Sequence, residues 1–266
     1  MIGTGARPDD WDRHWTDLGD SATQNPAQAM RRRLIHGLLQ VEGAQSHILD
    51  IGCGKGDLAA ELAAQHPGAQ VHGIDSSRRG IELAAVHVPA ATFATHDLLA
   101  PGGPPPERAC WATHAVCSEV LEHVDDPRTL LAAARGYLAP GCRLVVTVPG
   151  GPMSAFDRHI GHRRHFTIPT LHALLTQAGF EVETVTGAGF PLFNLYRLAV
   201  VARGERLVQD AERSGFGSPS LLGRLAAGIF GLLLGVPQPR NRWGWQLLAV
   251  ARVPGAPDGR GQAPSC

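Results

Sequence analysis

Two carboxylates and an imidazole stand at helical spacing in the middle of the chain. Glu119, Glu122 and His123 occupy positions i, i+3 and i+4, so a helix would present all three side chains on one face. Carboxylates and imidazoles can take a proton from a reacting group. A further histidine, His162, lies in the stretch DRHIGHRRHF of residues 157–166. We expect Glu119, His123 and His162 to be catalytic side chains.

The stretch ILDIGCGKGDLAAELA, residues 48–63, predicts a strand, a glycine turn and a helix. Its first residues are apolar, as in a buried parallel strand. Leu58 and Leu62, four residues apart, begin a helical pattern. Three glycines lie between the strand and the helix and put no Cβ in the way: Gly52, Gly54 and Gly56. We therefore expect a ligand to contact bare backbone at the N-terminus of this helix.

The residues around this turn favour S-adenosylmethionine (SAM) over a dinucleotide. A dinucleotide fingerprint has the spacing G-x-G-x-x-G, but Asp57 stands where its third glycine would be. A carboxylate there would repel a pyrophosphate. SAM carries a sulfonium and an ammonium group instead, and Asp50, just before the turn, is suited to attract that cationic end.

Acidic residues recur where the next predicted strands end. Asp75 lies 21 residues after Gly54, where a carboxylate can accept both ribose hydroxyl protons. Asp97 could accept the adenine amino group, and Leu98 offers a backbone donor and an apolar wall. The predicted strands are residues 48–51, 71–75, 91–94, 112–118, 143–148, 180–185 and 245–253. Because strands alternate with helices, we expect a doubly wound, mostly parallel α/β sheet that binds its ligand at the carboxyl ends of the strands.

The 266 residues suit one large domain with an insertion. Trp11 and Trp15 could fasten an N-terminal helix to the domain or cover a ligand. The apolar run LLGRLAAGIFGLLLGV is too short to span a membrane and could instead form a helical cap, a pocket wall, or a contact with a membrane surface or a second copy through residues 190–236. The expected parts are an N-terminal helical lid (1–40), the SAM-binding core (41–186), a helical insertion (187–240), the last strand (241–253) and a disordered tail (254–266).

The composition bears on partners and compartment. The chain has 24 basic and 24 acidic residues and a net charge of zero, which does not favour nucleic acid as a partner. The arginine-rich residues 158–164 are the one feature of the sequence that would suit RNA as a methyl acceptor. The five cysteines are odd in number, and the N-terminus lacks the apolar core of a signal peptide, so we expect a cytoplasmic protein.

Five motifs occur in the order and spacing of the class I SAM-dependent methyltransferases, and the chain resembles that family over about residues 20–186 and the last strand. The motifs are ILDIGCGKG, GIDSS, HDL, SEVLEHV and LAPGCRLVVTVP. The ubiquinone-type O-methyltransferases are most similar, because a comparable E-x-x-E-H stretch follows their fourth strand. One departure is Ala112-Thr113, where the family often has an aromatic residue and an aspartate.

The resemblance implies a Rossmann-like methyltransferase fold with seven strands, the last one antiparallel, and a helical insertion before it. It also implies a set of SAM-binding residues by position. These residues are Arg31, Asp50, Gly52, Gly54, Asp75, Ser76, Asp97, Leu98 and Ser118.

The resemblance further suggests a divalent metal, because the E-x-x-E-H face holds one in ubiquinone-type and small-RNA O-methyltransferases together with a downstream histidine. The matching ligands are Glu119, Glu122, His123 and His162. Two carboxylates and two imidazoles suit Mg²⁺, Mn²⁺, Fe²⁺ or Zn²⁺. Without a metal, His123 or His162 would be the general base. His159 and His165 are expected to be structural or to face the substrate.

The expected activity is SAM-dependent transfer of a methyl group to a hydroxyl of a small, apolar or aromatic molecule. The alternatives are N- or C-methylation of a small metabolite, a nucleotide-dependent oxidoreductase, and a SAM-binding module without catalysis. Asp57 argues against the oxidoreductase.

Overall fold

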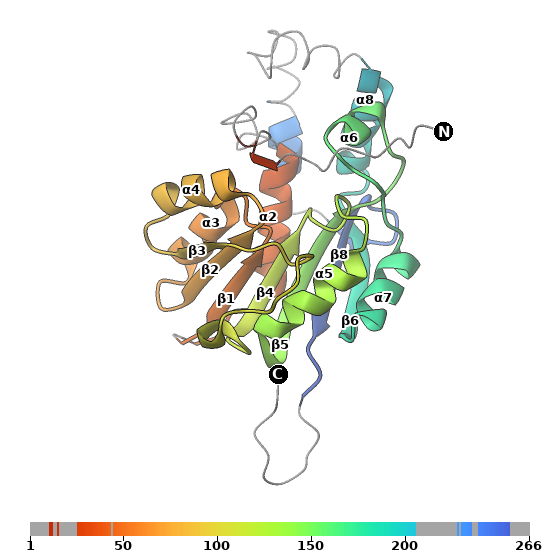
Figure 1. The fold of residues 1–266 in the computed structure, drawn as a ribbon. Coiled ribbons are helices and arrows are strands. Elements are labelled where there is room, and N and C mark those ends of the chain that lie inside the picture. Colours follow the sequence, from red (N-terminus) through yellow and green to blue (C-terminus); the bar gives the residue numbers. More distant parts are fainter. Residues whose placement is uncertain are drawn as a thin grey trace, which may run out of the picture.

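The chain folds around one sheet (Figure 1). The computed structural model describes residues 11–12, 15, 26–43, 45–205, 228, 230–235 and 239–255. The strands are β1 (His47–Ile51), β2 (Gln70–Asp75), β3 (Thr92–Thr95), β4 (Ala112–Ser118), β5 (Leu138–Pro149), β6 (Glu181–Ala188), β7 (Arg240–Asn241) and β8 (Gln246–Arg252). They lie in the order β3-β2-β1-β4-β5-β8-β6-β7. The five strands from β3 to β5 are parallel, and β8 is antiparallel to both neighbours. The predicted mostly parallel α/β sheet with an antiparallel last strand is confirmed.

All seven predicted strands are present, and the sheet contains one more. The additional strand, β7, has only two residues and pairs with the end of β6. It straddles the expected boundary between the insertion (187–240) and the last strand (241–253), and two residues are too few for an alternating pattern to predict a strand.

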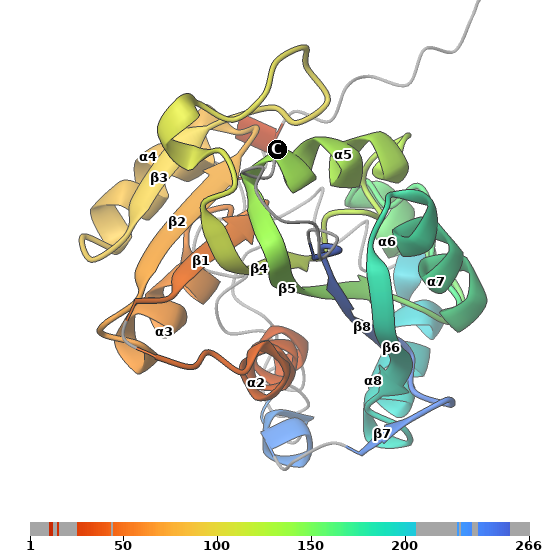
Figure 2. The same cartoon turned by 90° about the horizontal axis from the view of Figure 1, so that it is seen from below.

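Helices cover both faces of the sheet (Figure 2). One face carries α5 (Pro127–Ala134) and α7 (Ile168–Gln177), and the other carries α2 (Pro26–Leu39) and α3 (Asp57–Gln65). Alternate residues of β1 serve the two faces, as strand geometry requires. Leu49 and Ile51 pack with α5 and α7, whereas Ile48 packs with α2 and α3. Helix α4 (Arg78–His87) packs against β2 and β3.

The sequence predicts a helix capped by Asp125 or Asp126, with Pro127 in its first turn and its end at Pro140-Gly141. The structure confirms the start of this helix, α5, but not its end. The Asp126 side chain accepts a hydrogen bond from the Thr129 amide at 3.1 Å, and Pro127 occupies the first helical position. The expected end at Pro140-Gly141 is wrong. Helix α5 ends at Ala134, because Leu138 already pairs with Ala112 in the sheet and Pro140 lies within β5.

Much of the described part of the predicted insertion is helical and packs on the core. It includes α8 (Leu192–Ala202), and residues 228 and 230–235 are also helical. Phe193 and Leu234 form a small apolar cluster with Met30 and Ala27 of α2. The side chain of Asn194 bonds to the backbone at Trp243 and Trp245, at 2.8 and 3.0 Å. These contacts attach the described helices of the insertion to the core.

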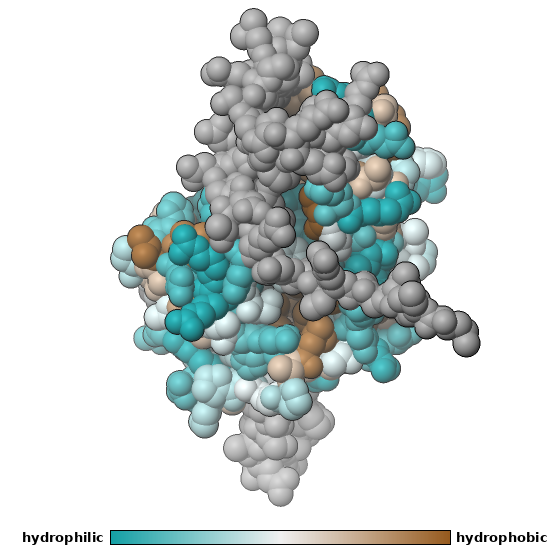
Figure 3. All heavy atoms as spheres, turned by 45° about the horizontal axis from the view of Figure 1, so that its top comes forward, coloured by the Kyte–Doolittle hydropathy of each residue, from teal (hydrophilic) through white to brown (hydrophobic). Residues whose placement is uncertain are grey.

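Five of the eight large hydrophobic residues that are exposed in the described ranges lie between residues 190 and 236: Phe190, Leu195, Leu198, Leu232 and Leu233. The face in Figure 3 shows hydrophobic atoms only as small, separate patches. Within the described helices, none is long and apolar enough to cross a bilayer. A contact of this region with a membrane surface or a second copy stays a prediction, as do the domain boundaries. The expected tail lies outside the described residues from residue 256 onward.

Candidate active site

A cleft of about 500 Å³ lies beside the carboxyl ends of β1, β2 and β4. Seven of the residues predicted to bind the cofactor or to act in catalysis line it, although they come from four separate stretches of the chain. They are Gly52, Asp75, Ser76, Asp97, Leu98, Glu119 and His123. The topology therefore brings these residues to one place, as the position of ligand sites in doubly wound sheets requires.

The glycine turn needs glycine for two reasons. Gly52 and Gly54 have φ of +72° and +52°, a region that other residues adopt only with strain. A Cβ on Gly52 would also lie 2.3 Å from Cγ2 of Val120. The amide of Gly54 donates to Asp75 Oδ2 at 2.9 Å, and the amide of Ser77 donates to Oδ1 at 2.8 Å. Asp75 thus fixes the turn while its remaining acceptor sites stay open to a ligand.

Asp50 lies buried at the end of β1. Burial, together with the charge of Asp75, raises the pKa of Asp50 to about 7. Its Oδ2 makes no hydrogen bond with any described residue. A buried carboxylate without a partner is costly, so this position favours a cationic ligand.

Three N-terminal residues that were not predicted as site residues lie in the same cleft. Asp12 Oδ1 accepts hydrogen bonds from Ser77 Oγ at 2.6 Å and from the Arg79 amide at 3.0 Å. The ring of Trp15 covers Gly54, where a Cβ would approach it to 2.3 Å. Trp11 meets His123 edge to face, with ring centroids 4.8 Å apart. The two tryptophans in a polar N-terminus were the only sequence signal for this contact.

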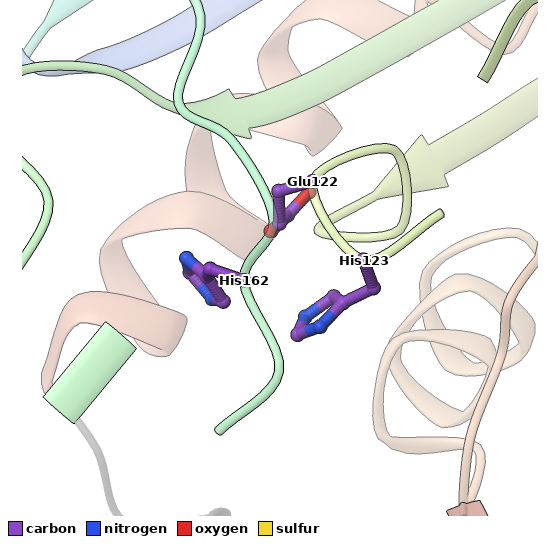
Figure 4. Close-up of side chains that lie close together, drawn as sticks. All are labelled: Glu122, His123 and His162. Carbon is purple, nitrogen blue, oxygen red and sulfur yellow. The ribbon is translucent and has the colours of Figure 1, made fainter. Parts of the chain in front are cut away.

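The E-x-x-E-H stretch is a turn, and the predicted helical face is wrong. Glu119 has φ of +57°, and residues 121–123 form a hydrogen-bonded turn. The cause is sheet pairing, because the Glu119 amide donates to the Thr147 carbonyl at 2.9 Å and extends the β4–β5 ladder. The turn nevertheless aims Glu122 and His123 at His162 (Figure 4), and one ligand atom from each of the three lies within 4.8 Å of the others.

Glu119 faces away from this cluster. Its Oε2 forms an ion pair with Arg31 at 2.9 Å, and its Oε1 accepts from Gln246 Nε2 at 3.0 Å. Arg31 also donates to Gln246 Oε1 at 3.2 Å. Glu119 is therefore not among the candidate metal ligands that the structure brings together. Arg31 is likewise occupied, and Ser118 bonds through its Oγ to Thr147 Oγ1 at 2.8 Å.

Glu122 is buried to 0% exposure, and neither carboxylate oxygen accepts a hydrogen bond from any described residue. Burial, followed by the nearby Glu119, raises the pKa of Glu122 well above its usual range. Such a group needs either a proton or a cation. One carboxylate and two imidazoles form a donor set that suits a transition metal or Zn²⁺, so the residues present fit the metal that the resemblance suggested.

Further polar residues lie behind His162 and contact it or one another. His162 Nδ1 and His165 Nε2 are 3.1 Å apart. Asp157 is held by the guanidinium of Arg197 through two hydrogen bonds of 3.1 and 2.8 Å. Burial raises the pKa of Asp157, but Arg197 and the hydrogen bonds from Ser154 together outweigh it and lower the pKa to about 2. Burial lowers the pKa of His162 to about 3. No sequence motif predicted a role in the site for Asp157, Arg197 or Gln246.

Comparison with known proteins agrees with this geometry. A family model described as a methyltransferase domain matches residues 24–185. The ubiquinone biosynthesis O-methyltransferase of Xylella fastidiosa (strain 9a5c) is 31% identical over 212 residues, covering 71% of this chain and 80% of that protein.

Solved structures show the same fold. Phosphoethanolamine N-methyltransferase 2 of Haemonchus contortus in complex with S-adenosyl-L-methionine has a TM-score of 0.60 at 18% identity, covering 95% of this chain and 61% of that one. The [4+2]-cyclase SpnF has a TM-score of 0.62 at 18% identity, covering 96% of this chain and all of that one, 100%. Because the family model matches residues 24–185 and the Xylella fastidiosa relative matches 71% of the chain, the chain belongs to the class I SAM-dependent methyltransferases.

Proposed function

We propose that this methyltransferase moves the methyl group of SAM to a hydroxyl of a small, apolar or aromatic molecule. The observation that carries the proposal is the Glu122–His123–His162 cluster, because His123 also lines the cleft that contains the glycine turn. Methyl transfer is an in-line displacement, so the acceptor oxygen must lie in line with the methyl and lose its proton. A cluster of this kind beside the cofactor suits that task.

SAM would lie between the glycine turn and the strand ends. In this proposal Asp75 accepts the ribose hydroxyls, Asp97 and Leu98 contact the adenine, and Asp50 attracts the cationic end. Gly52, Gly54 and Ser76 offer backbone beside them. Arg31 would have to leave Glu119 to reach the SAM carboxylate, and Ser118 would have to leave Thr147.

A divalent metal would be held by Glu122, His123 and His162. When bound, it would lower the pKa of the acceptor hydroxyl and so ease its deprotonation. The chain's own contribution is to bury Glu122 beside His162 and away from water, which favours a bound cation over a solvated one. Without a metal, the ring of His162 or His123 would take the proton.

Two measurements test the proposed activity. Thermal melting with SAM and with NAD separates the cofactor classes, since only SAM should raise the melting temperature. Labelled SAM with a panel of phenols, aliphatic alcohols and amines then identifies the acceptor atom. Label in the hydroxyl compounds supports the proposal. Label only in the amines would replace it with N-methylation, and SAM binding without any transfer would indicate a binding module.

SAM affinity should fall as the pH drops below about 7. Asp50 has its pKa near 7 in the free protein, and the cationic end of SAM favours its charged form, so binding at lower pH must release a proton. The loss should approach tenfold per pH unit. Calorimetry between pH 7.5 and 5.5 checks this, and Asp50→Asn should bind more weakly with a flatter pH dependence. Equal affinity across this range in the wild type would exclude the role of Asp50.

We also propose that the N-terminal part of residues 1–40 is a lid over the cofactor. The contacts of Asp12 with Ser77 and of Trp15 with Gly54 support this. Trp15→Ala should speed SAM dissociation, because the ring would no longer close the cleft, and stopped-flow displacement measures the rate. Val86→Ala, an exposed apolar change on α4, is the control. Slower dissociation from the Trp15 variant would contradict the lid.

A further inference from the structure

A chain of hydrogen bonds runs from the backbone to His162. His165 Nδ1 lies 3.1 Å from the carbonyl oxygen of Gly151, and His165 Nε2 lies 3.1 Å from His162 Nδ1. The His165 side chain is only 6% exposed, whereas Gly151 lies at the surface. Gly151 is fixed in turn, since a Cβ there would lie 2.6 Å from Cδ2 of Trp245. The acceptor at the end of the chain is therefore held in place.

The direction of each hydrogen bond follows from this acceptor. A carbonyl oxygen only accepts, so His165 Nδ1 must carry a proton and donate it. In a neutral imidazole the other nitrogen is then bare, so His165 Nε2 accepts. His162 Nδ1 must be the donor to it. His162 is thus protonated at Nδ1, and its Nε2 is left with a free lone pair.

A carboxylate lies near these two rings but is bound to other groups. The nearest carboxylate, Asp157, lies 3.9 Å from His165 Nε2, but its oxygens already accept from Arg197 and from Ser154. At 3.9 Å, Asp157 is too far from His165 Nε2 for a hydrogen bond. The carbonyl of Gly151 therefore sets the direction of the hydrogen bonds.

We propose that His165 is a positioning residue that holds His162 in the tautomer protonated at Nδ1, so that Nε2 is the nitrogen left bare for a ligand or a proton. The purpose of this arrangement rests on the proposed function. A bare Nε2 is what His162 needs to bind a divalent cation or to accept the proton of the acceptor hydroxyl. The tautomer itself is a property of the metal-free, substrate-free protein.

Nuclear magnetic resonance of the ¹⁵N-histidine-labelled protein tests the tautomer directly. Long-range proton–nitrogen correlation in the metal-free protein should show His162 protonated at Nδ1 and bare at Nε2. His165→Leu should convert His162 to a mixture of tautomers, whereas His165→Gln, whose carbonyl can still accept, should keep the wild-type form. His159→Gln, an exposed histidine change on α6 (Ala155–His159), should change nothing. Protonation of His162 at Nε2 in the wild type, or an unchanged tautomer in His165→Leu, would overturn the proposal.

Binding of Mn²⁺ alone gives a second readout. If His162 is a ligand, His165→Leu should weaken Mn²⁺ binding by about 10- to 100-fold, the usual cost of losing a group that orients a ligand. His165→Gln should retain most of the affinity. Equal Mn²⁺ affinity in His165→Leu and the wild type would contradict the positioning role. A wild type that binds no Mn²⁺ would refute the metal of the proposed function and leave the tautomer to be decided by its resonances.

Discussion

Replacing Glu122 by alanine should lower kcat by about 10²- to 10⁴-fold, the range that a positioned proton-transfer group contributes. The alanine variant cannot hold a cation between its two remaining imidazoles, so the acceptor hydroxyl must lose its proton without the help of the metal. SAM binding should stay within a factor of about two to three, since the proposed cofactor contacts come from the glycine turn and from Asp75 and Asp97. Steady-state kinetics and calorimetry with SAM separate the two effects.

His162→Ala should behave in the same way, and His159→Ala is its matched control. Both histidines lie in the segment of α6 and the loop after it, but His159 is exposed and outside the cluster. The control should keep the wild-type kcat. If Glu122→Ala or His162→Ala turned over at the wild-type rate, the cluster would have no part in the chemistry.

Asp75→Ala should weaken SAM binding by about 1–3 kcal/mol, because it removes the acceptors that we propose for the ribose hydroxyls and leaves the amides of Gly54 and Ser77 unpaired. Its carboxylate also holds the amides of Gly54 and Ser77 at 2.9 and 2.8 Å, so the glycine turn loses its anchor as well. Calorimetric titration with SAM gives the change directly.

The control for Asp75 is Asp126→Ala, which removes the cap of α5 outside the lining of the cleft. That variant should lose about 0.5–2 kcal/mol of stability, as N-cap losses do, with its SAM affinity unchanged. Asp75→Ala with wild-type affinity would mean that the ribose lies elsewhere.

Local signals in the sequence predicted the sheet and the glycine turn. The apolar run before Gly52 and the glycines themselves predict β1 and the backbone site that follows it, because both depend on adjacent residues. The Asp126-Pro127 start of α5 is local for the same reason. The family resemblance added the antiparallel last strand, which the sheet confirms.

Contacts that depend on the assembled sheet could not be predicted in this way. Spacing alone made Glu119 and Glu122 neighbours on a helix, but pairing of Glu119 with Thr147 turns their side chains to different partners. Gln246 reaches Glu119 across 127 residues, and Arg197 reaches Asp157 across 40. No local sequence pattern predicts contacts between residues so far apart in the chain. These partners can be identified only once the positions of β8 and α8 are known.

We propose above that the Glu122–His123–His162 cluster serves hydroxyl methylation with a bound divalent metal. The most direct measurement is transfer of labelled methyl from SAM to an accepting hydroxyl compound by the wild-type protein, with and without excess chelator. We predict transfer that chelator abolishes and Mn²⁺ or Zn²⁺ restores, with SAM binding unaffected throughout. Full transfer in excess chelator, by protein that elemental analysis finds free of metal, would contradict the claim.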